Sequence, residues 1–129
     1  MDDASDLAGQ PIALERIDDF VYRATGLSNV YLVKTDEGDV VIDTGFVMIA
    51  AQQKAVLSEI SSGPASYIIL THAHGDHVTG TALWRGEDTR VIAHSEFPQR
   101  MAMQKRLTPY FNKRNHFFYP YAPTELPPN

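Results

Sequence analysis

The alternation of apolar and polar positions along the chain predicts a set of short strands. Runs rich in β-branched and aromatic residues, which favour strands, occur at 20–23, 29–34, 40–42 and 90–93. Turn residues at 36–38 separate the second run from the third, so residues 29–42 are expected to form a hairpin. The run 67–70 is apolar throughout and is bounded by turn residues, which indicates a buried central strand.

Helical periodicity follows two of these strands. Apolar residues between 47 and 60 recur at the spacing of an amphipathic helix, and the Ser-Ser-Gly-Pro sequence at 61–64 ends that helix. A second helix is expected to begin after a capping Ser95 and to run through Met101, Met103 and Leu107. Strands that alternate with helices in this order predict an α/β fold.

The chain divides into three segments by composition. Residues 1–16 are polar and irregular, so we expect a loosely ordered N-terminal segment or a sheet edge. Residues 17–118 contain most of the apolar periodicity and form the expected domain. Residues 119–129 contain four prolines, which is typical of an extended tail or a linker.

Composition and charge exclude several kinds of site and partner. The chain has no cysteine, so histidine and carboxylate side chains must bind any metal ion. A formal net charge of −5 argues against a nucleic-acid partner. No apolar run reaches the length of a membrane span, so we expect no membrane partner. Residues 1–6 lack the apolar segment of a secretory signal, which leaves a cytoplasmic location as the default expectation.

Candidate metal ligands concentrate directly after the buried strand. His72, His74, Asp76 and His77 fall within six residues. In an extended chain side chains alternate, so the first two imidazoles point to the same side. The backbone freedom of Gly75 allows a sharp turn that presents the other two residues. Imidazole and carboxylate together suit Zn²⁺, with Fe or Mn as alternatives. Exposed loop histidines without a ligand are the competing interpretation, which the density of four candidates disfavours.

The remaining histidines and the tryptophan are interpreted as structural. His94 is expected to cap the helix that follows it rather than to bind a metal ion. His116 adjoins Phe117 and Phe118, a cluster typical of packing rather than of chemistry. Trp84 is expected in the core or at its rim.

The sequence His72-Ala73-His74-Gly75-Asp76-His77 resembles the His-x-His-x-Asp-His signature of the metallo-β-lactamase superfamily. Asp43-Thr44-Gly45, at the end of the run 40–42, is similar to that family's first motif, and Gly80 also suits the pattern. The resemblance covers residues 17–126 and is confined to the N-terminal half of the family's domain. It implies half of an αββα sandwich, a mixed sheet with helices on one face.

The resemblance also implies roles for the motif residues. His72 and His74 would bind a first metal ion, and Asp76 and His77 a second. Asp76 would in addition be catalytic, because it would orient the attacking water. Asp43 would support the metal loop from outside the ligand set. One or two zinc ions are the implied cofactor, with Fe or Mn as alternatives.

The implied activity is that of a metallo-hydrolase acting on a small-molecule substrate. Metal-bound hydroxide would attack an ester, thioester, amide or sulfate-ester bond. The family's second half contributes further ligands, and nothing after His77 fills those places. We therefore expect a chain that is incomplete alone and that forms a homodimer or pairs with a complementing second half. A non-catalytic metal-binding or assembly module is the alternative, and a purely structural α/β domain is the third.

Overall fold

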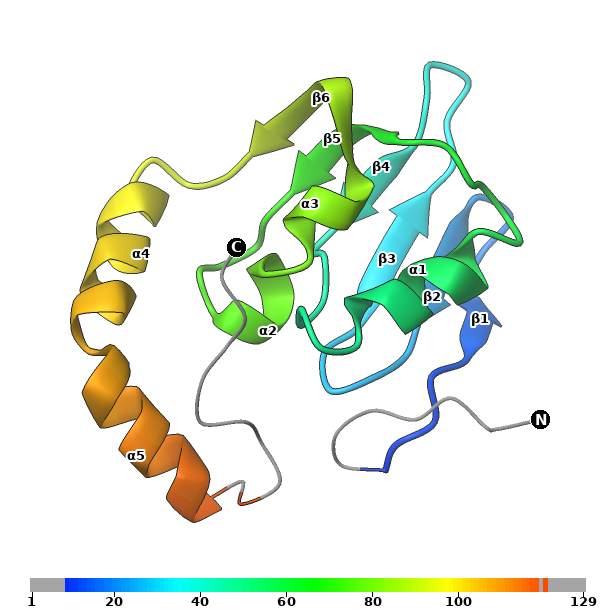
Figure 1. The fold of residues 1–129 in the computed structure, drawn as a ribbon. Coiled ribbons are helices and arrows are strands. Elements are labelled where there is room, and N and C mark those ends of the chain that lie inside the picture. The colour runs from blue at the N-terminus through cyan, green and yellow to red at the C-terminus, as the bar shows by residue number, and fades with distance from the viewer. Residues whose placement is uncertain (1–8, 119, 121–129) are drawn as a thin grey trace.

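A single mixed sheet organises the computed structural model, which describes residues 9–118 and residue 120. Its six strands lie in chain order across the sheet (Figure 1). The first four form an antiparallel meander, and the last three run parallel to one another. The strands are β1 (Leu14–Arg16), β2 (Val21–Ala24), β3 (Val30–Val33), β4 (Val40–Ile42), β5 (Ala65–Ile69) and β6 (Arg85–Ile92).

Three helices connect the parallel strands and cover one face of the sheet (Figure 1). Helix α1 (Ala50–Leu57) joins β4 to β5, and the short helices α2 (Gly75–Val78) and α3 (Thr81–Trp84) join β5 to β6. Two further helices, α4 (Phe97–Arg106) and α5 (Thr108–Phe118), follow β6. The α/β class and the mixed sheet with helices on one face, as predicted from the sequence, are confirmed.

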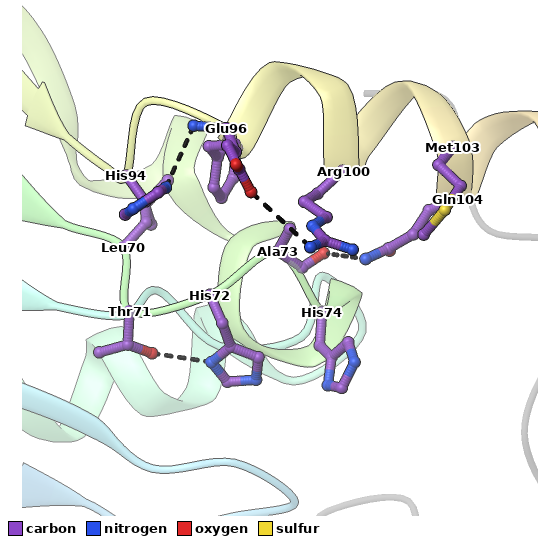
Figure 2. A pocket seen from close by; sticks show the side chains of 11 residues that line it. Leu70, Thr71, His72, Ala73, His74, His94, Glu96, Arg100, Met103 and Gln104 are labelled. Atoms are coloured by element: carbon purple, nitrogen blue, oxygen red, sulfur yellow. Dashed lines mark hydrogen bonds and ion pairs between the residues drawn. The ribbon is translucent and has the colours of Figure 1, made fainter.

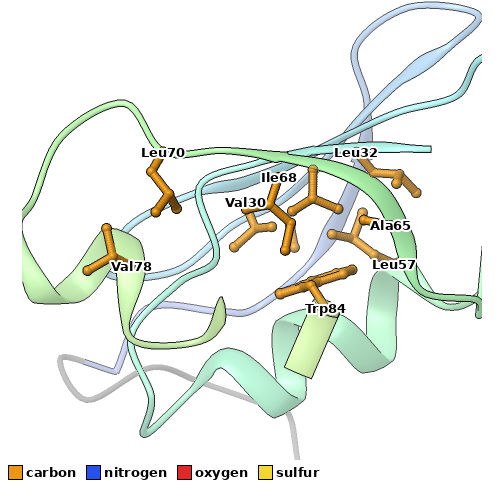
Figure 3. Packing of buried hydrophobic residues seen from close by; sticks show 10 residues of the cluster. Val30, Leu32, Leu57, Ala65, Ile68, Leu70, Val78 and Trp84 are labelled. Atoms are coloured by element: carbon orange, nitrogen blue, oxygen red, sulfur yellow. The ribbon is translucent and has the colours of Figure 1, made fainter. Parts of the chain in front are cut away.

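The core lies between the sheet and these helices. Leu32, Val41 and Ile68 are partners in register on three neighbouring strands, and all three are buried. Leu57 from α1 and Trp84 from α3 close the cluster from the helical side (Figure 3). Fully burying an aliphatic side chain of this size contributes about 1.5–3 kcal/mol. The prediction that the tryptophan lies in the core is confirmed.

Several predicted bounds differ from the structure. The helix expected over 47–60 is shorter, because its two ends are turns that flank α1. The strand expected over 90–93 is the last part of β6, whose first residues are polar and exposed and so gave no apolar signal. Residues 14–16 form the edge strand β1, so the sheet begins before residue 17. The predicted tail 119–129 lies outside the described residues except for Pro120.

The start of α4 and the end of α5 also correct the sequence interpretation. Glu96, not Ser95, is the N-cap of α4, and Pro98 occupies the first turn, where its missing N–H costs no hydrogen bond. His94 lies at this helix start as predicted, because its Nδ1 accepts a hydrogen bond from the Glu96 N–H at 3.1 Å. The expectation that His116 packs with its aromatic neighbours is wrong: it is exposed, and Phe117 is 80% exposed. Within the described residues, no helix has the length and hydropathy to cross a membrane.

Candidate metal centre

The Asp-Thr-Gly and histidine segments meet because β4 and β5 are parallel neighbours. Asp43 follows β4, and Thr71 follows the end of β5. The carboxyl ends of parallel strands lie at the same edge of a sheet, which is where α/β folds gather ligands. Main-chain hydrogen bonds join the two segments, from the Asp43 N–H to the Ile69 carbonyl at 2.9 Å and from the Thr44 N–H to the His77 carbonyl at 2.7 Å.

Asp43 is the buried anchor of the histidine loop. The residue is only 6% exposed, and its φ of 56° is in the left-handed region, which among non-glycine residues Asp and Asn adopt most readily. Oδ1 accepts a hydrogen bond from the Thr71 N–H at 2.9 Å, and Oδ2 accepts one from the Thr71 hydroxyl at 2.7 Å. Oδ2 also lies 2.8 Å from Nδ1 of His77.

Three imidazoles gather beside this anchor. The ring of His72 lies 4.7 Å from that of His74 and 4.1 Å from that of His77, measured between centroids. Nδ1 of His72 lies 2.9 Å from the Thr71 hydroxyl, and Nδ1 of His77 faces Asp43. Each of these two rings therefore keeps its Nε2 for another partner. Asp76 joins the group, with Oδ2 3.4 Å from Nε2 of His77. The structure thus brings all four predicted ligand residues together.

A group of three side chains whose spacing could hold a metal ion differs from the predicted ligand set. One ligand atom each of Asp43, His72 and His77 lie within 4.8 Å of one another. Both oxygens of Asp43, however, already accept hydrogen bonds from the loop. A carboxylate used in this way orients an imidazole and raises its basicity, which is how residues behind metal ligands act. The donor set facing outward therefore consists of imidazole nitrogens and the Asp76 carboxylate, a combination that fits Zn²⁺.

The protonation of His72 also suits metal binding. Desolvation by neighbouring atoms lowers the pKa of this largely exposed imidazole, and positive charge on His77 and His74 lowers it further, against the opposing effect of Asp43 and Asp76. A histidine with a lowered pKa is neutral at pH 7, and the neutral imidazole is the form that binds a metal ion.

The main chain of the motif is held by Thr44 of the Asp-Thr-Gly segment and by two residues that no sequence motif singled out, Ser28 and Gln53. The Ser28 hydroxyl donates to the Asp76 carbonyl, and the Ser28 carbonyl accepts a hydrogen bond from the buried Gln53 side chain at 2.7 Å. The Thr44 hydroxyl donates to the His77 carbonyl at 3.2 Å. Ser28 is 48 residues from Asp76 in the chain, so no local sequence signal pointed to this contact.

Gly75 has a different role from the one predicted. It is the first residue of α2, and its φ is not among the positive values of the described glycines. The turn of α2, rather than a glycine-specific conformation, therefore presents Asp76 and His77. A Cβ at this position would meet only ordinary van der Waals contact, with Thr79 at 3.7 Å.

An open pocket of about 320 Å³ lies between the histidine loop and α4. Its lining combines apolar side chains, among them Leu70 and Met103, with the polar His94 and Arg100. In Figure 2 the rings of His72 and His74 point away from α4, whereas Gln104 reaches the loop main chain from the helix. The pocket thus adjoins the loop on the side of α4.

Comparison with known proteins identifies the family of the chain. The family model described as the metallo-beta-lactamase superfamily matches residues 23–128. The chain belongs to the metallo-β-lactamase superfamily. This membership confirms the resemblance carried by the histidine motif. No curated protein sequence matches the chain.

Solved structures of the metallo-β-lactamase fold resemble this chain over part of their length. The sec-alkylsulfatase Pisa1 from Pseudomonas sp. has a TM-score of 0.71 at 21% identity, over 82% of this chain and 19% of that one. A metallo-β-lactamase from Cronobacter sakazakii has a TM-score of 0.62 at 27% identity, over 72% and 35%. The mono-zinc form of FIM-1 from Pseudomonas aeruginosa has a TM-score of 0.60 at 19% identity, over 74% and 47%. The match therefore covers less than half of each of these proteins.

Proposed function

We propose that this chain supplies the metal-binding half of a metallo-hydrolase that cleaves an ester, thioester, amide or sulfate-ester bond in a small molecule. The observation that carries the proposal is the convergence of three imidazoles and Asp76 beside a buried Asp43. His72 and His74 would hold a first zinc ion, and Asp76 and His77 a second. When bound, zinc supplies a Lewis acid that lowers the pKa of water to about 7 and polarises the bond to be cleaved.

The residues of the chain have separable roles in this proposal. Asp43 holds His77 through Nδ1, and the Thr71 hydroxyl holds His72 through Nδ1, so both rings present Nε2 outward. The Asp76 carboxylate lies beside Nε2 of His77, where it would orient the attacking water and accept its proton. Fixing these groups before substrate binds reduces the entropic cost of reaching a reactive geometry.

The face of the sheet that the described residues leave uncovered supports the proposal of a partner. Tyr31, Ile42, Ile69 and Ile92 are register neighbours, and they lie on the face opposite the buried core. None of the four is buried, and Ile92 is 49% exposed. A contiguous apolar row of this kind marks an interface. We propose that a second copy of the chain covers it.

Metal analysis of purified variants tests the site. His72→Ala, His74→Ala and Asp76→Ala are each expected to lower the zinc content after dialysis against zinc at fixed concentration, because each removes a ligand. His116→Ala, which removes an exposed imidazole from α5, is the matched control and should bind as much zinc as the unmodified chain. If zinc content is the same in all four variants, the site assignment is wrong.

Hydrolysis assays separate the enzyme from the non-catalytic module. The zinc-loaded chain, assayed with an activated ester and an alkyl sulfate, is expected to show turnover that His74→Ala abolishes. Turnover that survives in His74→Ala would point to a contaminant and contradict the proposal. Tight zinc binding with no hydrolysis of either substrate would instead favour a non-catalytic metal-binding or assembly module.

A further inference from the structure

A side chain of helix α4 donates a hydrogen bond to the main chain of the metal loop. The Gln104 side-chain amide donates from Nε2 to the carbonyl of Ala73 at 2.7 Å, across 31 residues of sequence. Ala73 separates His72 from His74 in the motif, and it is only 8% exposed. Figure 2 shows Gln104 reaching this carbonyl from α4, while the two imidazoles point away from the helix.

The position of Gln104 on α4 explains why it reaches the loop. Phe97 and Met101 pack against the hydrophobic core, and Gln104 follows them at the i, i+4, i+7 spacing of one helix face. The rest of α4 is exposed or half-exposed, and none of its residues is buried. The inner face of the helix therefore ends in an amide donor at the place where the loop presents the Ala73 carbonyl.

The loop depends on such contacts because it has no regular secondary structure. Residues 71–74 lie between the end of β5 and the start of α2. Asp43 holds the Thr71 end of the loop, and the His74 carbonyl at the other end accepts the N–H of His77 at 3.0 Å. Between these two points, one side chain among the described residues donates a hydrogen bond to the loop main chain. That side chain is Gln104.

We propose that Gln104 is a positioning residue for the metal centre, a role that rests on the proposed function. The orientation of the Ala73 peptide sets the directions in which the flanking His72 and His74 side chains leave the main chain. Fixing that peptide keeps both imidazoles directed at a common point. Losing a hydrogen-bond partner that orients a metal ligand typically weakens metal affinity 10–100-fold, and we expect an effect at the lower end of that range here.

Zinc affinity and stability measured on the same variants test this role. Gln104→Met keeps the length of the side chain but removes its donor, and Gln104→Glu replaces the donor with a carboxylate that repels the carbonyl. Both are expected to weaken zinc binding at least about tenfold in competition with a chromophoric chelator. Gln99→Met, an exposed position on the same helix, is the control and should bind as the unmodified chain does.

A purely structural role predicts the opposite pattern. In that case the melting temperature of the metal-free protein would fall in Gln104→Met while its zinc affinity stayed unchanged, and the proposal would be wrong. Equal affinity and equal stability in all variants would overturn it as well.

Histidine NMR resonances of the metal-free chain provide a readout that does not depend on zinc. In Gln104→Met, the ring signals of His72 and His74 should shift, whereas that of His116 should not. If the unmodified chain binds no zinc but these shifts occur, the proposed function fails and the positioning contact stands. If it binds zinc and neither affinity nor shifts change in Gln104→Met, only the role of Gln104 is wrong.

Discussion

Asp43 combines three features that are rarely found in one residue. It is buried, it has a left-handed backbone, and its two oxygens accept hydrogen bonds from Thr71 and face Nδ1 of His77. Its resemblance to the first motif of the family implied support for the metal loop. The atoms it contacts were not predictable, because they lie 28 and 34 residues further along the chain.

Replacing this carboxylate should separate its electrostatic role from its structural one. Asn tolerates the left-handed conformation, so Asp43→Asn should fold. If the Asn oxygen keeps the hydrogen bond from the Thr71 N–H, its NH2 group faces Nδ1 of His77. That nitrogen must then be unprotonated, so the ring proton moves to Nε2 and blocks metal binding. We expect zinc affinity to fall at least about tenfold. Asp36→Asn, in an exposed turn, is the control.

Removing the side chain altogether should affect folding as well. Asp43→Ala leaves the Thr71 N–H and hydroxyl without their acceptor, which should lower the free energy of unfolding by about 2–3 kcal/mol. Urea denaturation of the metal-free variants measures this difference. For the Asp43→Asn variant, an unchanged zinc affinity would show that the contact between Asp43 and His77 does not set the tautomer of the His77 ring.

The short helices α2 and α3 depend on a close approach to the Asp-Thr-Gly segment. Gly80, between them, donates its N–H to the Gly45 carbonyl at 3.1 Å. A Cβ on Gly80 would lie 2.1 Å from the Thr44 carbonyl oxygen and 2.7 Å from Cβ of Ala50. The family pattern pointed to Gly80. The physical reason for a glycine at this position is that the turn between α2 and α3 packs directly against the Asp-Thr-Gly segment.

Gly80→Ala should therefore move α2 and α3 away from the segment that follows β4. We expect a loss of about 1–3 kcal/mol in the free energy of unfolding, because a main-chain carbonyl cannot yield as a flexible side chain can. Gly63→Ala is the control: a Cβ there meets nothing within 4 Å, so its effect should stay within about 0.5 kcal/mol. Equal stability of the two variants would contradict the close packing of Gly80.

At the scale of the whole molecule, the described elements cover one face of the sheet and leave the other open. Helices α1 to α3 bury the covered face. The apolar row of Tyr31, Ile42, Ile69 and Ile92 lies on the open face. The alternation of side chains along each strand places apolar residues on both faces, which is typical of a strand that is buried on both sides. This arrangement is the physical basis for the proposed pairing.

Light scattering coupled to gel filtration tests the pairing. We expect the unmodified chain to elute with the mass of a dimer, and Ile92→Lys to shift it toward the monomer because a charge would be buried in the interface. Leu83→Lys, at an exposed apolar position on α3, is the matched control and should leave the dimer intact. A stable monomer of the unmodified chain would contradict pairing between copies and leave the complementing second half as the covering layer.

The sequence by itself determined the fold class, the superfamily and the cluster of four candidate ligands, because strand periodicity and a compact motif are local properties of the chain. It did not determine the contacts of Ser28, Gln53 and Gln104, which support the motif from distant segments. Nor did it show that α2, rather than the freedom of Gly75, presents Asp76 and His77. These features depend on which segments meet when the parallel strands align, and that is decided by packing across the whole sheet.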